Sequence, residues 1–176
     1  MNIADNHFAL FGLPERFALD AKALDTAYRD VQGHVHPDRF ADAGATEQRV
    51  ALQWATRANE AYRTLRDPLR RAAYLCNLRG ADLEIESNTA MPAEFLMRQL
   101  EWREALDDAR DADDAEALQE LEAALDDERS ALMRRLEIAL DQAPDIGHAV
   151  EAVRQWMFIE RFREDLASLA EKLEAD

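Results

Sequence analysis

The tripeptide His36-Pro37-Asp38 constrains the fold most strongly, because it separates two long helical patterns. Apolar residues in 19–35 recur at three- and four-residue spacings, which is typical of one buried helix face. Pro37 lacks an amide hydrogen and disfavours the helical conformation of His36, so the first helix should end there. A second pattern begins at residue 46 or 47 and continues to 66. The sequence therefore predicts a helical hairpin whose exposed loop carries the tripeptide.

Local signals predict further helix boundaries in the first eighty residues. Asp20 is a candidate N-cap for the first long helix. Asp67-Pro68 places a cap before a proline at the first helical position, and the helix that follows should end at Gly80. Residues 8–13 form a short helical turn or apolar strap, and residues 40–46 form a polar loop.

The second half of the chain contains three amphipathic patterns. They cover residues 92 to about 110, 113–142 and 145 to the C-terminus, and they follow a segment without sustained periodicity at 81–91. Three helices with short connections favour an antiparallel bundle. We therefore expect an all-α protein that consists of an N-terminal helical hairpin with flanking short helices and a C-terminal three-helix bundle.

Charge changes sharply near residue 80. Residues 1–79 hold eleven Lys and Arg against ten Asp and Glu, whereas residues 80–176 hold ten against twenty-seven. This asymmetry marks a change of module. A surface with a net charge of −16 argues against nucleic acid and anionic membranes as partners.

Several classes of site are excluded by composition. The single cysteine, Cys76, forbids an internal disulfide and a cysteine-rich metal site. His34 and His36 are two residues apart and have no further ligands at a usual spacing, so we expect no metal and no cofactor. A His36 and Asp38 catalytic pair lacks a nucleophile, so no catalytic residue is assigned. No apolar run is long enough for a membrane span, and no secretory pattern is present, so we expect a cytoplasmic protein.

The helix expected over residues 92–110 carries two distinct faces. Its core face is made by five residues: Phe95, Gln99, Trp102, Leu106 and Ala109. On the opposite side, four residues fall within roughly 60° of one another at 100° per residue: Met97, Glu101, Glu104 and Asp108. Leu96 and Leu100 flank this row, and Phe158 on the last helix extends the patch if the two helices are neighbours. An apolar patch beside carboxylates indicates a partner surface.

The first 75 residues resemble a J-domain, the module that stimulates ATP hydrolysis by DnaK-class chaperones. The resemblance rests on the order of an apolar start, a helix, His36-Pro37-Asp38, and a long helix that contains Asn59-Glu60-Ala61-Tyr62. It implies that the tripeptide contacts the chaperone, with Arg29 and Arg39 as the remaining basic contacts. J-domains usually carry Arg or Lys just before the tripeptide, whereas this chain has Gln32 and Gly33. The expected docking surface therefore has few basic residues.

Nearly the whole chain is similar to the HscB family of iron–sulfur co-chaperones, of the bacterial type without a zinc module. The matching segments are Leu10-Phe11-Gly12-Leu13-Pro14, the tripeptide, residues 70–75 and residues 95–107. The resemblance implies a J-domain (1–79) that engages the chaperone HscA, a linker (80–91), and a bundle (92–176) that binds the scaffold protein IscU. The family's scaffold-binding pattern maps onto seven residues: Leu96, Met97, Leu100, Glu101, Glu104, Asp108 and Phe158. Asp108 stands where Glu is common.

Two other functions fit the same residues. A J-domain adaptor for a different client would keep residues 1–78 and differ in what residues 95–108 bind. A structural protein would use the second half as a self-associating coiled coil, although Gln99 interrupts the apolar stripe and the short loops favour packing within one chain. A stand-alone enzyme is disfavoured, and we expect a chain that is monomeric or weakly self-associating.

Overall fold

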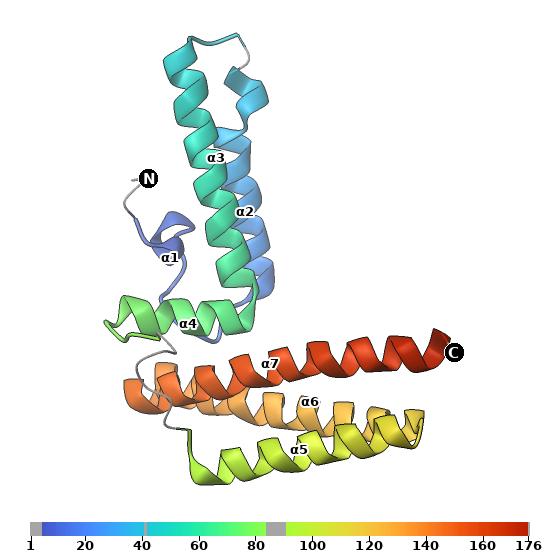
Figure 1. Cartoon of the computed structure of the whole chain (residues 1–176). Helices are drawn as coiled ribbons and strands as arrows, with labels where there is room; N and C mark the ends of the chain where they lie inside the picture. Colours follow the sequence, from blue (N-terminus) through green and yellow to red (C-terminus); the bar gives the residue numbers. More distant parts are fainter. Residues whose placement is uncertain (1–4, 41, 84–90, 176) are drawn as a thin grey trace. The chain divides into compact units, whose positions relative to one another are not determined.

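A computed structural model describes residues 5–40, 42–83 and 91–175, and every regular element in these ranges is helical (Figure 1). This confirms the all-α fold predicted from the sequence. The chain divides into two compact units, Met1–Leu78 and Arg79–Asp176. Most of the linker predicted at residues 80–91 lies outside the described residues.

The first unit is a helical hairpin with short flanking helices. Its elements are α1 (His7–Leu10), α2 (Ala21–Val35), the 3-10 helix η1 (Pro37–Phe40), α3 (Ala45–Arg66) and α4 (Pro68–Leu78). Helices α2 and α3 run side by side in opposite directions, with η1 near the turn between them (Figure 1).

The helix boundaries in this unit follow local chemistry. Asp20 accepts a hydrogen bond from the Lys22 amide at 2.8 Å, which confirms it as the N-cap of α2. Asp67 accepts one from the Arg70 amide at 3.0 Å, ahead of the α4 start at Pro68. The expected start of α3 at residue 46 or 47 was slightly late, because Gly44 occupies the N-cap position and the helix begins at Ala45. Phe40 belongs to η1, so the loop predicted from residue 40 is also shorter.

Small residues bring α3 close to its neighbours. Ala51, Ala55, Ala58 and Ala61 are buried along one face of α3, followed by Leu65. A methyl side chain leaves room for a facing helix, so α1 and α2 can approach α3 closely. The core of this unit is therefore shaped as much by the small size of these alanines as by its large side chains.

The short helix α1 covers the hairpin from one side. Phe8 is fully buried, and His7 is only 4 % exposed. The His7 ring stacks on Tyr74 of α4 with ring centroids 4.2 Å apart, and the His7 amide donates to the Tyr74 hydroxyl at 3.0 Å. The buried Nδ1 of His7 has no hydrogen-bond partner among the described residues.

The second unit is a three-helix bundle. It contains α5 (Ala93–Asp111), α6 (Ala115–Glu137), the π-helical turn η2 (Ile138–Gln142) and α7 (Ile146–Ala175), and the three long helices lie along one another in Figure 1. Its innermost side chains come mainly from α6 and α7: Leu125, Leu132, Leu136, Leu140, Val153 and Ile159.

Two boundaries in the bundle differ from the prediction. Helix α6 is capped by Asp114, whose carboxylate accepts from the Ala117 amide at 3.0 Å, whereas Asp113 has a positive φ of 52° outside the helix. The predicted single helix over 113–142 also ends early, because residues 138–142 form the wider π turn. That turn buries two consecutive residues, Ala139 and Leu140.

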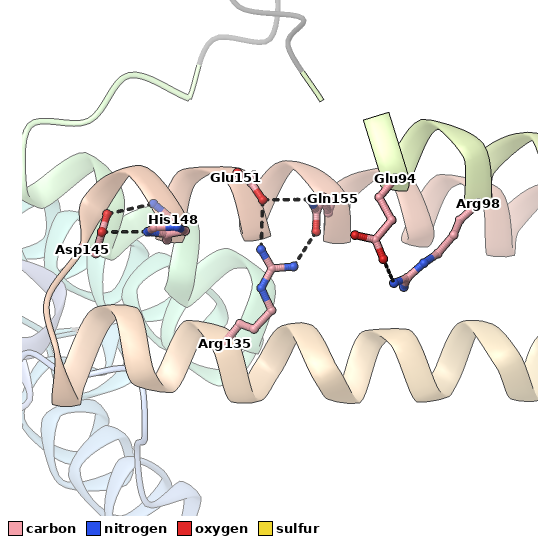
Figure 2. Close-up of polar contacts among 7 residues, drawn as sticks. All are labelled: Glu94, Arg98, Arg135, Asp145, His148, Glu151 and Gln155. Carbon is pink, nitrogen blue, oxygen red and sulfur yellow. Dashed lines mark hydrogen bonds and ion pairs between the residues drawn. The ribbon is translucent and has the colours of Figure 1, made fainter. Parts of the chain in front are cut away.

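Polar contacts link the helices of the bundle, and Figure 2 shows those between α6 and α7 together with one within α5. Arg135 of α6 donates to Gln155 at 2.9 Å and to Glu151 at 3.0 Å on α7, and the Gln155 amide donates to Glu151 at 3.2 Å. Arg98 of α5 contacts Glu94 on its own helix and Glu128 on α6. Because Gln155 is only 2 % exposed, its contacts satisfy polar groups that would otherwise be buried without partners.

The buried His7 predicts a pH-dependent stability of the first unit. Burial is the main cause that lowers the pKa of His7 below its ordinary value of 6.5, with Arg57 adding to the effect. As the pH falls, His7 therefore takes up a proton in the unfolded chain before it does so in the folded chain. The neutral, buried His7 makes its full contribution to the unfolding free energy above about pH 6.5, and this contribution is lost as the pH drops from there to the folded-state pKa.

We expect the unfolding free energy of the first unit to fall between pH 7 and pH 5.5, with a smaller fall in His7→Phe. Hydrogen exchange of peptides from residues 5–78, corrected for intrinsic rates, measures this energy in the whole chain. His34→Gln, which changes an exposed imidazole, is the matched control. Equal pH dependence in His7→Phe and in the unchanged protein would contradict the assignment.

Candidate functional site

The His-Pro-Asp loop begins where α2 ends. His36 is the C-cap of α2, with an extended backbone at φ −60° and ψ 128°, and its amide still donates to the Gln32 carbonyl at 3.0 Å. Pro37 then opens η1, and the Arg39 amide donates to the His36 carbonyl at 3.1 Å. The tripeptide is thus held in one compact turn at the end of the hairpin.

Within this turn, His36 and Asp38 face each other and remain open to solvent. The Asp38 amide donates to Nδ1 of His36 at 3.3 Å, and the Asp38 carboxylate lies 3.6 Å from the same nitrogen. Their side chains are 52 % and 88 % exposed. Contacts this open contribute little to folding, and both side chains remain accessible at the end of the hairpin.

The two basic residues predicted beside the loop have different surroundings. Arg39 donates to the Gly33 carbonyl, so it caps the last turn of α2, where a glycine weakens the helix. Arg29 is exposed and donates from Nε to the Asp25 carbonyl at 3.1 Å. Arg39 therefore has a structural role in the loop that the sequence did not reveal.

Aromatic and polar contacts fasten α2 to α3 below the loop. Tyr28 stacks on Tyr62 with centroids 4.2 Å apart, and its hydroxyl donates to Asn59 at 2.7 Å. The Gln32 amide also donates to Asn59, at 2.6 Å. Sequence reasoning treated Gln32 only as a missing basic residue, because a contact with Asn59 on the next helix has no local signal.

An ion pair extends this contact toward the opposite end of α2. Asp25 accepts hydrogen bonds from Arg66 and, at 2.9 Å, from the Tyr62 hydroxyl. These bonds hold the pKa of the Asp25 carboxyl below its usual value, and the bond to Asp25 is the main cause that raises the pKa of Tyr62. The hairpin is thus held together along most of its length.

A second exposed surface lies on α5. Leu96, Met97 and Leu100 are 45 %, 59 % and 53 % exposed. Glu101, Glu104 and Asp108 are exposed beside them, and no ion pair engages their carboxylates among the described residues. We call these six residues the acidic-apolar face. Of the five residues predicted for the core side of α5, Phe95, Trp102 and Ala109 are buried, whereas Gln99 and Leu106 are half-buried.

Phe158 differs from Leu96, Met97 and Leu100, the other apolar residues of the expected partner surface. It is half-buried rather than exposed, its ring meets Phe95 edge-on at 5.8 Å, and it stacks on Phe162 at 6.1 Å. The two helices are neighbours at this point, and Phe158 lies at the edge of the patch as a half-buried residue. A helical projection gives direction but cannot show that a neighbouring aromatic ring covers one side of the residue.

Neither a metal-binding cluster nor a membrane-spanning helix occurs in the part of the chain that the structure describes. No group of three or more His, Cys, Asp or Glu among them is placed to hold a metal ion. Within the same ranges, no helix has the length and apolar character required to cross a membrane.

A hairpin with an exposed His-Pro-Asp loop, joined to a separate helical bundle, defines a co-chaperone of the J-domain class. Comparison with known proteins narrows this class. Residues 91–167 match the family model described as the HSCB C-terminal oligomerisation domain. Proteins named co-chaperone protein HscB homolog from Burkholderia mallei and Burkholderia vietnamiensis are each 56 % identical over 174 residues, covering 99 % of both chains.

Solved structures agree with the sequence comparison. HscB from Vibrio cholerae is 34 % identical with a TM-score of 0.81, covering 96 % of this chain and 99 % of that one. The human co-chaperone HscB is 25 % identical with a TM-score of 0.87, covering 95 % and 83 %. This chain belongs to the HscB family of co-chaperones, whose members are in general not enzymes.

The exposure of the acidic-apolar face predicts how its side chains affect folding. Leu96→Ala/Met97→Ala/Leu100→Ala should change the unfolding free energy little, within about 0.5 kcal/mol per site, as is usual for surface positions. Phe158→Ala should cost about 2 kcal/mol, because it removes two aromatic contacts. Thermal melts of the two variants measure the difference. A melting temperature that falls further in the triple variant than in Phe158→Ala would mean that the face is part of the core.

Proposed function

We propose that this protein couples the DnaK-class chaperone HscA to the iron–sulfur scaffold IscU. The observation that carries the proposal is that one chain presents two separate exposed surfaces, the His-Pro-Asp loop and the acidic-apolar face. The first would stimulate ATP hydrolysis by the chaperone, and the second would bring the scaffold to it. The modules in this proposal are a J-domain at residues 1–79, a linker at 80–91 and a scaffold-binding bundle at 92–176.

On the chaperone side, His36, Pro37 and Asp38 are the proposed contacts, assisted by Arg29 and Arg39. A co-chaperone can shift the conformations of its partner only through contacts that differ between them. The exposed His36 and Asp38 side chains are suited to this, since they have few bonds to lose within their own chain. Arg29 adds positive charge beside the loop, and Arg39 keeps the turn in place.

On the scaffold side, the three exposed apolar residues of α5 are the proposed anchors, and Phe158 forms the edge of the surface on α7. Burying a Leu or Met side chain contributes about 1.5–3 kcal/mol relative to leaving it exposed, so a few anchors can supply much of the binding energy. Glu101, Glu104 and Asp108 would select a partner with basic groups, because their carboxylates have no competing ion pairs among the described residues.

Joining the two surfaces in one chain raises the local concentration of scaffold at the chaperone, so a transient ternary complex forms without new contacts. In this proposal the chain itself carries out no chemical step and binds no cofactor. ATP hydrolysis belongs to HscA, and maturation of the cluster belongs to the scaffold system. We propose that the chain acts in the cytoplasm, as a monomer or a weak oligomer.

The chaperone assignment predicts a loss of stimulation without a loss of fold. Asp38→Asn and His36→Gln should abolish acceleration of HscA ATP turnover, because each removes an exposed group of the tripeptide. Steady-state turnover with and without each variant measures the effect. IscU binding should remain unchanged in both, which controls for misfolding. Full stimulation by either variant would rule out the proposed contact.

The scaffold assignment predicts the reverse pattern. Leu96→Ala/Met97→Ala/Leu100→Ala should weaken IscU binding by orders of magnitude, since each desolvated anchor typically contributes about 2 kcal/mol or more. Calorimetric titration with IscU measures the affinity, and stimulation of HscA in the absence of IscU should persist. Unchanged affinity would favour a J-domain adaptor with a different client.

A further inference from the structure

A hollow of about 250 Å³ opens between α5 and α7 beside the acidic-apolar face. Its apolar lining comes from Leu106, Phe158 and Phe162. Arg103 of α5 and Arg161 of α7 line it from the two helices, accompanied by Asp107 and Asp165. The hollow therefore combines an aromatic floor with charged groups from both walls.

This hollow is continuous with the acidic-apolar face. Leu96, Leu100, Arg103 and Asp107 follow one another at spacings of four, three and four residues, which places them along one side of α5. Phe158 lines the hollow and is also the proposed edge of the scaffold-binding surface. A partner that rests on Leu100 and Phe158 therefore also covers the hollow.

The two arginines of the hollow are free to pair with such a partner. Five other arginines of the second unit form ion pairs with carboxylates: Arg98, Arg110, Arg129, Arg135 and Arg163. Among the described residues, Arg103 and Arg161 form none, and neither do Arg79, Arg134 and Arg154; of these five, Arg103 and Arg161 are the two that line the hollow. Asp107 is already bound to Arg110 at 2.8 Å, which reduces its competition for Arg103.

We propose that this hollow is a subsite that binds a carboxylate side chain of IscU; the inference rests on the function proposed above. Covering two guanidinium groups without supplying an acceptor would cost free energy, because each loses its hydration. A carboxylate matches the planar, forked donors of arginine. The aromatic floor lowers the local dielectric constant and strengthens the pair.

With the subsite, the partner surface has an acidic side and a basic side. The row of Glu101, Glu104 and Asp108 attracts basic groups, whereas Arg103 and Arg161 attract an acidic group on the side toward α7. A partner must then carry both signs at the correct separation, and the reversed orientation brings like charges together. The apolar anchors alone cannot impose this direction, since hydrophobic contact is non-directional.

Calorimetric titration of the full chain with purified IscU tests the subsite. Arg103→Glu/Arg161→Glu should weaken binding by about tenfold or more, because it places like charge against the partner carboxylate. Arg134→Glu is the matched control, since Arg134 is an exposed arginine of α6 that does not line the hollow, and its affinity should stay near that of the unchanged protein. A thermal melt of each variant confirms that the bundle remains folded.

Asp165→Asn provides an independent test in the opposite direction. Removing this carboxylate raises the positive potential around Arg161, so IscU should bind several-fold more tightly. Weaker binding would indicate that a basic group of IscU occupies the hollow and would overturn the subsite. The subsite would also be overturned if Arg103→Glu/Arg161→Glu bound IscU with unchanged affinity while Leu96→Ala/Met97→Ala/Leu100→Ala lost binding. If that triple variant also binds normally, the proposed function itself fails.

Discussion

The close approach of α2 and α3 is the constraint on which the first unit depends. Four buried alanines on α3 leave the space in which Tyr28 lies against Tyr62, and the hydrogen bonds to Asn59 exist only at that distance. A larger side chain at Ala55 or Ala58 would separate the helices, as overpacking of a dense core does. The hairpin would then lose the contacts of Tyr28 and Gln32 that hold α2, and with it the tripeptide that follows, against α3.

Much of this fold could be predicted because its determinants are local. Asp20 and the Asp67-Pro68 pair act on amides within a few residues, and the breaks at Pro37 and Gly80 are properties of single residues. The features that sequence reasoning missed depend on contacts between helices. The π turn at residues 138–142 and the role of Gln32 arise from packing across the fold, for which one helical pattern carries no signal.

The proposed sites show the same division. Projection of α5 identified Leu96, Met97 and Leu100 as apolar residues outside the core, and their exposure agrees with that expectation. Projection could not place Phe158 against Phe95, because the phase between two helices depends on tertiary packing. The hollow beside Phe158 could likewise not be predicted from the sequence, because its two arginines are 58 positions apart in the chain.

The unpaired carboxylates of the acidic-apolar face also affect the self-association of the protein. A two-fold dimer is isologous, so two copies meeting through Leu96, Met97 and Leu100 would bring both sets of Glu101, Glu104 and Asp108 into the same contact. Like-charge repulsion at close range opposes that encounter most strongly at low ionic strength. The acids therefore disfavour self-association through these apolar residues, so under the function proposed above the face would stay available to a partner of opposite charge.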